Sequence, residues 1–195
     1  MAGLSKSRNT AVLGTPADGG ANLYYPVEAS TTIYLGGIVA IDSNGYAVPA
    51  QAKGSSPLDS MIVVGIAREV YYPGPAGLIP YGGGAHGPGV PGTDAVNQSS
   101  TILPDGSAAG AAGAMYIRVE RCIAQLDADS SIVQAVVGKV VFAKDDHTVQ
   151  ATDGSGTLVA AGTLVMLGDI PTAPAFGTSP VGCYVDLSRQ GAAAT

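Results

Sequence analysis

Charged residues are scarce in this sequence. Nine Lys and Arg and fifteen Asp and Glu make up 12% of the 195 residues, about half the share of an ordinary globular domain. The formal net charge is −6, and no cluster of Lys and Arg offers a groove for nucleic acid or a contact with an anionic membrane. We therefore expect no nucleic-acid partner and no membrane partner. So low a number of charged residues on the surface also predicts that other protein chains cover part of it.

Long hydrophobic runs are missing as well. No apolar segment reaches the ~18 residues that a membrane-spanning helix needs. The first residues, MAGLSKSRNTAVLG, contain two basic side chains with no continuous apolar stretch after them, which is not typical of a secretory signal. These features predict a soluble protein that is synthesised in a cytoplasm.

Cysteine is limited to Cys122 and Cys183. The period-two pattern before Cys122 predicts that it shares a polar face with Arg118 and Glu120. Cys183 alternates with apolar residues such as Val185, which predicts an apolar face. Because the two environments differ, we expect two reduced thiols and no disulfide.

Helical periodicity is nearly absent, and strand periodicity takes its place. Asp127–Val137 is the best helix candidate, with Asp129 or Ser130 as a possible N-cap, and it fits a further strand equally well. Many short strands with Gly and Pro between them predict an all-β fold, either a small β-barrel or a β-sandwich. The expected strands and hairpins are Thr31–Asp42 with Tyr46–Ala50, Met61–Tyr71, Ala114–Gln125, Gly138–Lys144 with His147–Thr152, Thr157–Leu167 and Val181–Leu187.

Two stretches depart from the strand pattern. Residues 1–22 have no sustained period and predict an extended N-terminal arm. Residues 73–114 hold Gly or Pro at 17 of 42 positions, which predicts a long Gly/Pro-rich loop insertion that lies against another subunit. The remaining organisation is a single β domain over 23–188, with that insertion inside it, and a flexible C-terminal tail over 189–195.

No motif in the sequence defines a catalytic site. Two matches to G-x-G-x-x-G within 82–92 lack the flanking strand and helix that phosphate binding requires. His147 follows Asp145 and Asp146, but neighbouring residues of a strand point to opposite faces, so we expect Asp146 and His147 not to converge. His86 lies in the glycine-rich stretch. We expect no enzyme, no cofactor and no metal, the alternative being a small hydrolase that uses Asp145 and His147.

Tyrosine is the one aromatic residue that is used freely, since there are nine Tyr, two Phe and no Trp. Tyr is common in interface cores because it combines a large area with a hydrogen-bonding tip. The alternative is that these side chains cover the ends of a barrel. The candidate interface residues are Val12 and Leu13 in the arm and Tyr24, Tyr25, Tyr71, Tyr72 and Tyr81 at the borders of the irregular segments.

Six segments, taken in order, carry a resemblance. The runs "DSNGYAVPA" and "GKVVFAKDDHTV" are its more specific parts. This order resembles the small capsid cement, or head-decoration, proteins of tailed bacteriophages. The segments are Val39–Ala50, Val63–Glu69, Tyr116–Val119, Val137–Thr152, Ala161–Leu167 and Tyr184–Leu187.

The resemblance implies a β-rich, non-enzymatic protein on the outer surface of the capsid of a virion. There it would bridge neighbouring subunits of the major capsid protein and stabilise the shell against the pressure of packed DNA. It also implies a homo-oligomer, a homotrimer being favoured and a dimer possible. The chain departs from the family in residues 73–114 and in its longer arm. The alternative is another β-rich virion component, such as a tail, fibre or adhesin module, although we find no internal repeat.

Overall fold

The computed structural model describes residues 12–14, 22–54, 58–74, 77–80, 95–97, 112–168 and 182–187. Within these ranges the chain forms fourteen strands and two 3₁₀ turns, η1 (Leu58–Ser60) and η2 (Gln134–Val136). The prediction of an all-β fold is confirmed. No helix among the described residues is long and apolar enough to cross a membrane.

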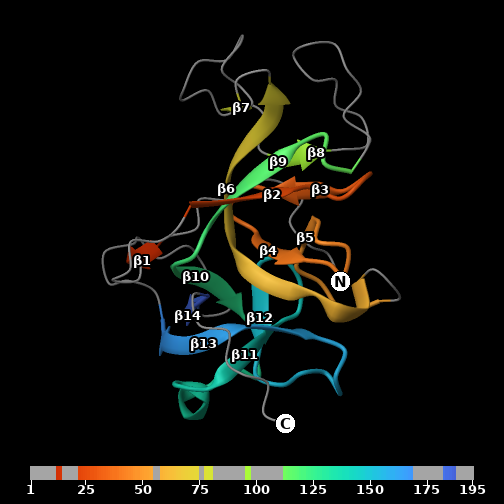
Figure 1. Ribbon diagram of the computed structural model, residues 1–195. Helices are drawn as coiled ribbons and strands as arrows, with labels where there is room; N and C mark the ends of the chain where they lie inside the picture. Colours follow the sequence, from red (N-terminus) through yellow and green to blue (C-terminus); the bar gives the residue numbers. More distant parts are fainter. Residues whose placement is uncertain are drawn as a thin grey trace.

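Five strands form a small closed barrel in the lower half of Figure 1. The ring closes because the last strand pairs with the first over five consecutive positions, from Ile123 opposite Asp186 to Asp127 opposite Gly182. Strand β1 (Val12–Gly14) lies beside the ring and pairs with its first strand, β10. The ring strands are β10 (Ile123–Ala128), β12 (Thr148–Gln150), β11 (Val140–Ala143), β13 (Val159–Leu167) and β14 (Gly182–Asp186).

A second sheet lies above the barrel in Figure 1, and we call it the open sheet. Its two edge strands meet only at one parallel bridge, between Val27 and Ala47. A separate two-stranded sheet joins β3 (Thr32–Tyr34) to β8 (Ala95–Asn97). The open sheet contains β2 (Asn22–Pro26), β9 (Tyr116–Glu120), β6 (Ile62–Gly74), β4 (Ile38–Ile41) and β5 (Ala47–Pro49), with β7 (Gly77–Pro80) paired to the end of β6.

The two predicted hairpin turns are confirmed, but the predicted strand Thr31–Asp42 is two strands, β3 and β4, which belong to different sheets. Between β4 and β5, Asp42 Oδ1 accepts hydrogen bonds from the backbone N–H groups of Asn44 and Tyr46, and Gly45 takes a positive φ of 86°. An Asp that closes a turn in this way is a common reason for Asp-x-Asn-Gly sequences. Between β11 and β12, Asp145 Oδ1 accepts from the N–H groups of His147 and Thr148.

The predicted strand Ala114–Gln125 is two strands. β9 ends at Glu120 and β10 begins at Ile123, because Arg121 and Cys122 carry the chain from the open sheet into the barrel. The expectation that Cys122 shares a polar face with Arg118 and Glu120 is therefore wrong, and Cys122 is fully buried. The predicted apolar position of Cys183 is confirmed.

The helix candidate Asp127–Val137 contains no α-helix. Its first two residues complete β10, and the rest forms turns and η2. Asp129 Oδ1 accepts the N–H of Ser131, so Asp129 closes a turn and does not cap a helix.

Two hydrophobic cores hold the described chain together. The shared core takes side chains from both sheets, among them Ile38 and Ile66 of the open sheet and Leu126 and Leu164 of the barrel. The second core lies on the other side of the open sheet and contains Ile33, Ile117 and Val119, among others. β4 passes between the two cores, which is why its sequence IVAI is apolar on both faces.

Two glycines permit close packing between strands. A Cβ at Gly162 would lie 2.2 Å from the Asp186 carbonyl oxygen, and one at Gly65 would lie 2.4 Å from the Glu120 carbonyl oxygen. Either contact is too short for any side chain. Gly162 thus allows β13 to approach β14 in the barrel, and Gly65 allows β6 to cross β9 in the open sheet.

Parts of the predicted arm and insertion are described. Residues 12–14 of the arm form β1, whose partner is β10 of the same chain. The insertion contributes β7 and β8. Most of both segments and the predicted tail over 189–195 lie outside the described residues.

Candidate docking face

The side of the open sheet that is opposite to the second core presents a polar and aromatic surface where β2, β9 and β6 lie side by side. Along β9, Ile117 and Val119 are buried in the second core, so Arg118 and its alternate neighbours point to the opposite side of the sheet. Arg118 lies opposite Tyr24 on β2 and opposite Glu69 on β6. We call this surface the tyrosine face, and it consists of Tyr24, Arg68, Glu69, Tyr71, Arg118 and Glu120.

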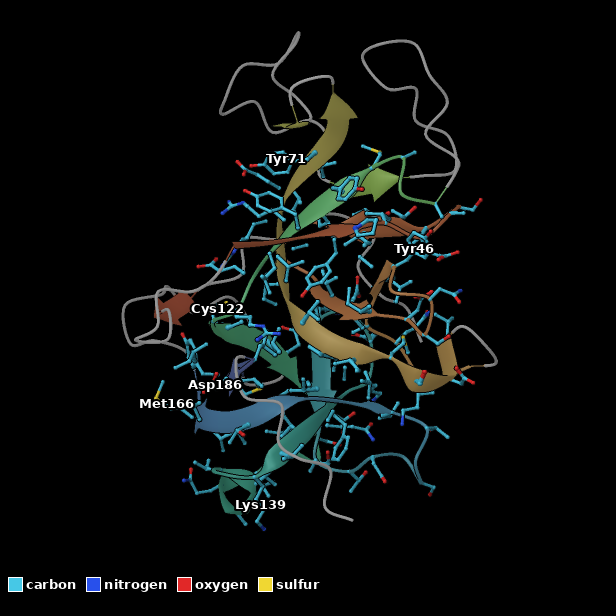
Figure 2. The ribbon with its side chains drawn as sticks, viewed as in Figure 1. Tyr46, Tyr71, Cys122, Lys139, Met166 and Asp186 are labelled. Carbon is cyan, nitrogen blue, oxygen red and sulfur yellow. The ribbon has the colours of Figure 1, made fainter. Side chains whose placement is uncertain are left out.

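The centre of the tyrosine face is a pair of aromatic rings. Tyr24 and Tyr71 meet edge to face, with their centroids 5.0 Å apart and their planes at 86°. Tyr24 is 42% exposed. Figure 2 shows Tyr71 on the upper part of the molecule, well away from the barrel. Such a geometry restricts the motion of both rings, so a molecule that bound to them would cost little further conformational freedom.

The Tyr71 hydroxyl is held by hydrogen bonding. It donates to Glu69 Oε2 at 2.8 Å. Partial burial raises the pKa of Tyr71, and the hydrogen bond to Glu69 raises it further. Tyr71 therefore remains a neutral phenol at any physiological pH, with its apolar ring available for contact.

Two ion pairs balance the charge of the tyrosine face. Arg118 Nε lies 2.9 Å from Glu69 Oε2, and Arg68 Nε lies 2.5 Å from Glu120 Oε2. Arg68 and Glu69 reach the same side of the sheet because the ladder between β6 and β9 is irregular between Ala67 and Glu69. Partly exposed pairs of this kind contribute little to folding, but they leave the face neutral in sum.

The edge of the open sheet adjoins the tyrosine face. Among the described residues, β2 pairs with β9 on one side and stands at the end of the strand order. A strand in this position can accept a further strand from another chain. Among the described strands, each of the five in the barrel ring has neighbours on both sides, and the end of that sheet's strand order is β1, which pairs with β10.

The structure brings together only part of the candidate interface set. Tyr24 and Tyr71 meet, whereas the neighbouring Tyr25 packs against the second core. Val12 and Leu13 belong to β1, and Tyr72 pairs with Ile79 of β7. Tyr81 lies outside the described residues.

The sequence predicted a polar face with Arg118 and Glu120, but the candidate interface residues did not include any charged member of the tyrosine face. The alternating run Tyr-Ile-Arg-Val-Glu over 116–120 contained the signal, because its period of two places Arg118 and Glu120 together on the side opposite to the buried Ile117 and Val119. The partners Arg68 and Glu69 were harder to find, since they are adjacent in sequence and reach one side only through the irregular pairing.

A second group of polar side chains lies at the turn between β11 and β12. The expectation that Asp146 and His147 would not converge is wrong. His147 Nδ1 lies 3.1 Å from Asp145 Oδ1 and 3.2 Å from Asp146 Oδ1. The alternation rule fails because these residues form a turn, and β12 begins only at Thr148. The arrangement brings an imidazole nitrogen and two carboxylates together, which is a set of potential metal ligands.

The two cysteines are free and buried. Burial raises the pKa of Cys122 to about 11 and that of Cys183 to about 12. Both thiols are therefore protonated at neutral pH and poor nucleophiles. The prediction of two reduced thiols is confirmed, and neither cysteine belongs to a reactive site.

Comparison with known proteins yields no relative for this chain. No protein-family model matches it, and no curated protein and no solved structure matches it.

Proposed function

We propose that this chain is a capsid cement protein that binds the outer surface of an icosahedral phage head. In this role it bridges neighbouring subunits of the major capsid protein and stabilises the shell against internal pressure. The observation that carries the proposal is the tyrosine face. It is an ordered, neutral and partly apolar surface beside a sheet edge, on a chain whose sequence segments resemble those of cement proteins.

The composition of the tyrosine face suits binding to protein. Exposed tyrosines supply large contact areas with two rotatable angles each, so they rank among the strongest contributors to interface energy. Known interfaces have an apolar centre with a polar rim, and the two Arg–Glu pairs beside the tyrosines would supply such a rim. A face with no net charge is also unsuited to a nucleic-acid backbone.

Stabilisation of a shell follows from binding alone. A protein that binds the assembled lattice more tightly than loose subunits shifts the equilibrium toward the assembled state. No catalysis is needed, and the buried, protonated cysteines are consistent with a structural role. Oligomerisation as a trimer or dimer would multiply the number of contacts and so increase the avidity for a symmetric shell.

The proposal is tested by adding the purified chain to phage heads that were assembled without it. We expect the chain to sediment with the heads at a saturable ratio and to raise the temperature at which they release DNA. Tyr24→Ala and Tyr71→Ala should each weaken binding about tenfold to thirtyfold, the loss expected for a central interface tyrosine.

Met166→Ala is the matched control. Met166 is similarly exposed, at 39%, but it lies on β13 of the barrel, below Tyr71 and at the left edge of the molecule in Figure 2. Its truncation should leave binding unchanged. If wild-type protein fails to bind heads, the cement function is wrong. If binding survives both tyrosine variants and is lost in Met166→Ala, the docking face lies on the barrel.

A further inference from the structure

Two carboxyl groups meet where the edge strands of the open sheet come together. The backbone N–H of Glu28 donates to the Ala47 carbonyl oxygen at 3.1 Å, next to the bridge between Val27 and Ala47. In the β4–β5 hairpin, Asp42 Oδ1 accepts the N–H of Tyr46 at 2.8 Å. Glu28 and Asp42 are therefore attached to two consecutive residues, and their carboxyl groups lie within hydrogen-bonding reach of each other.

Each of these two carboxyl groups has one oxygen atom without a partner. Asp42 is 5% exposed, and while its Oδ1 accepts backbone N–H groups of the turn, its Oδ2 is buried and accepts no hydrogen bond. Glu28 Oε2 is buried without a hydrogen-bond partner as well. Buried oxygen atoms of this kind are costly. Two ionised carboxylates only accept hydrogen bonds and cannot satisfy each other, whereas one added proton supplies the donor that both oxygen atoms lack.

No cationic side chain within the described ranges forms an ion pair with Glu28 or Asp42. The ion pairs of these ranges involve other carboxylates. Asp42 is the charged group that acts on Glu28, and Tyr46 of the same hairpin is the other titratable residue beside the pair. Burial and the Asp42 carboxylate both raise the pKa of Glu28, so Glu28 is the member of the pair that holds a proton more tightly.

Glu28 also borders a cavity of about 340 Å³. The other walls of this cavity come from residues before β3, from β5 and from η1, and they include Thr31, Val48, Gln51 and Leu58. The residues of these walls carry no charge, so none of them competes for the proton. A cavity of this size admits water. The proton can therefore exchange with solvent while Glu28 Oε2 and Asp42 Oδ2 remain buried.

We infer that Glu28 and Asp42 share one proton, in a hydrogen bond that Glu28 donates to Asp42 and that holds the edge strands of the open sheet together. This makes the contact between the edge strands sensitive to pH. The bond is fully present below the ordinary titration range of a Glu carboxyl and is lost as the pH rises through the raised pKa of Glu28. Two buried carboxylates then repel each other, and the pairing of Glu28 with Ala47 weakens. The inference is independent of the proposed docking function.

Nuclear magnetic resonance of the isotope-labelled full chain tests the shared proton. The Cδ chemical shift of Glu28, followed from pH 3 to pH 9, should show a midpoint above the ordinary 4.5 of a Glu carboxyl, and Asp42→Asn should lower that midpoint. The protection of the Glu28 amide against hydrogen exchange, corrected for its intrinsic rate, should fall about threefold to tenfold across the titration, the range expected for loss of one hydrogen bond. In Glu28→Gln the side-chain amide replaces the proton donor, so this protection should not change with pH.

Asp153→Asn is the matched control, because Asp153 also closes a turn through Oδ1, which accepts the N–H of Ser155 at 3.0 Å, but its side chain is exposed. This variant should keep the wild-type response to pH. Circular dichroism shows which variants are folded, and Asp42→Asn keeps the test valid if Glu28→Gln is unfolded, since its side-chain oxygen still accepts the N–H of Tyr46. The inference is overturned if Glu28 titrates at the ordinary value, if the protection of its amide does not change with pH, or if Glu28→Gln responds to pH as wild type does.

Discussion

The barrel and the open sheet bury similar apolar side chains but close in different ways. In the barrel a continuous ladder of five pairs joins β10 to β14, so every ring strand has two neighbours. In the open sheet the ends meet at a single bridge between Val27 and Ala47. The comparison teaches that ring closure leaves the barrel strands with neighbours on both sides, whereas the open sheet keeps an edge beside the tyrosine face, where we propose that a partner binds.

Because the barrel and the open sheet share a core, we expect them to unfold together. Truncation of core side chains should have the largest effect on stability and therefore tests this expectation first. Leu164→Ala in the barrel and Ile117→Ala in the open sheet should each lower the free energy of unfolding by about 2 to 5 kcal/mol, because both side chains are fully buried. Urea denaturation of each variant should show one transition in fluorescence and in circular dichroism alike. Two separate transitions would show that the sheets fold independently.

The barrel and the open sheet each contain a glycine at which two strands approach closely. Gly162→Ala in the barrel and Gly65→Ala in the open sheet should each lower the free energy of unfolding by about 1 to 3 kcal/mol, since the new methyl group meets a backbone carbonyl. Thermal unfolding measures the effect. Gly54→Ala is the control, because its Cβ would meet Leu58 at an ordinary 3.7 Å, and a loss as large as at Gly162 would contradict the explanation.

The tyrosine face should contribute more to binding than to folding. A double-mutant cycle between Tyr24→Ala and Tyr71→Ala should give a coupling in unfolding free energy of about 0.5 to 1.5 kcal/mol, the usual range for an edge-to-face pair. Each single variant should remain folded. Unfolding of either one would mean that the rings are part of the structural core, and that their effect on binding is indirect.

The single bridge between the edge strands of the open sheet lies beside a carboxyl group whose protonation affects the stability of the fold. Glu28 follows the bridging residue Val27, and burial together with the nearby Asp42 carboxylate raises the pKa of Glu28. A raised pKa means that Glu28 supports the fold when protonated, and that this contribution is lost as the pH rises through the raised value. One oxygen of each carboxyl, Glu28 Oε2 and Asp42 Oδ2, is buried without a hydrogen-bond partner.

Glu28→Gln should therefore be slightly more stable than wild type at neutral pH and should lose this advantage below pH ~4.5, the ordinary range of a Glu carboxyl. Melting temperatures measured between pH 3 and pH 8 test the expected convergence. An advantage that grows toward low pH would have the wrong sign and would exclude repulsion between Glu28 and Asp42 as its cause.

Much of the fold was predictable because it depends on local patterns. Alternation of apolar residues located most strands, and the turn residues around Asn44-Gly45 and Asp145 located both hairpins. The break at Arg121–Cys122 was not predictable, because alternation continues across it while the chain changes sheet. Closure of the barrel by β10 and β14 joins segments more than fifty residues apart, and no local pattern encodes that pairing.

The sites were less predictable than the strands. Tyr24 and Tyr71 were both candidates, but their contact depends on the order of three strands in the open sheet. The alternation rule gave the wrong answer for Asp146 and His147 because it applies within strands, and a turn can direct consecutive side chains to one point. Arg68 and Glu69 share a face only because the ladder between β6 and β9 shifts register there.

Cryo-electron microscopy of heads decorated with this chain tests the central claim most directly. The account predicts density for the chain on the outside of the shell, with Tyr24 and Tyr71 against the major capsid protein and the barrel directed away from it. Density inside the shell, no density at all, or a barrel seated on the capsid with both tyrosines in solvent would contradict it.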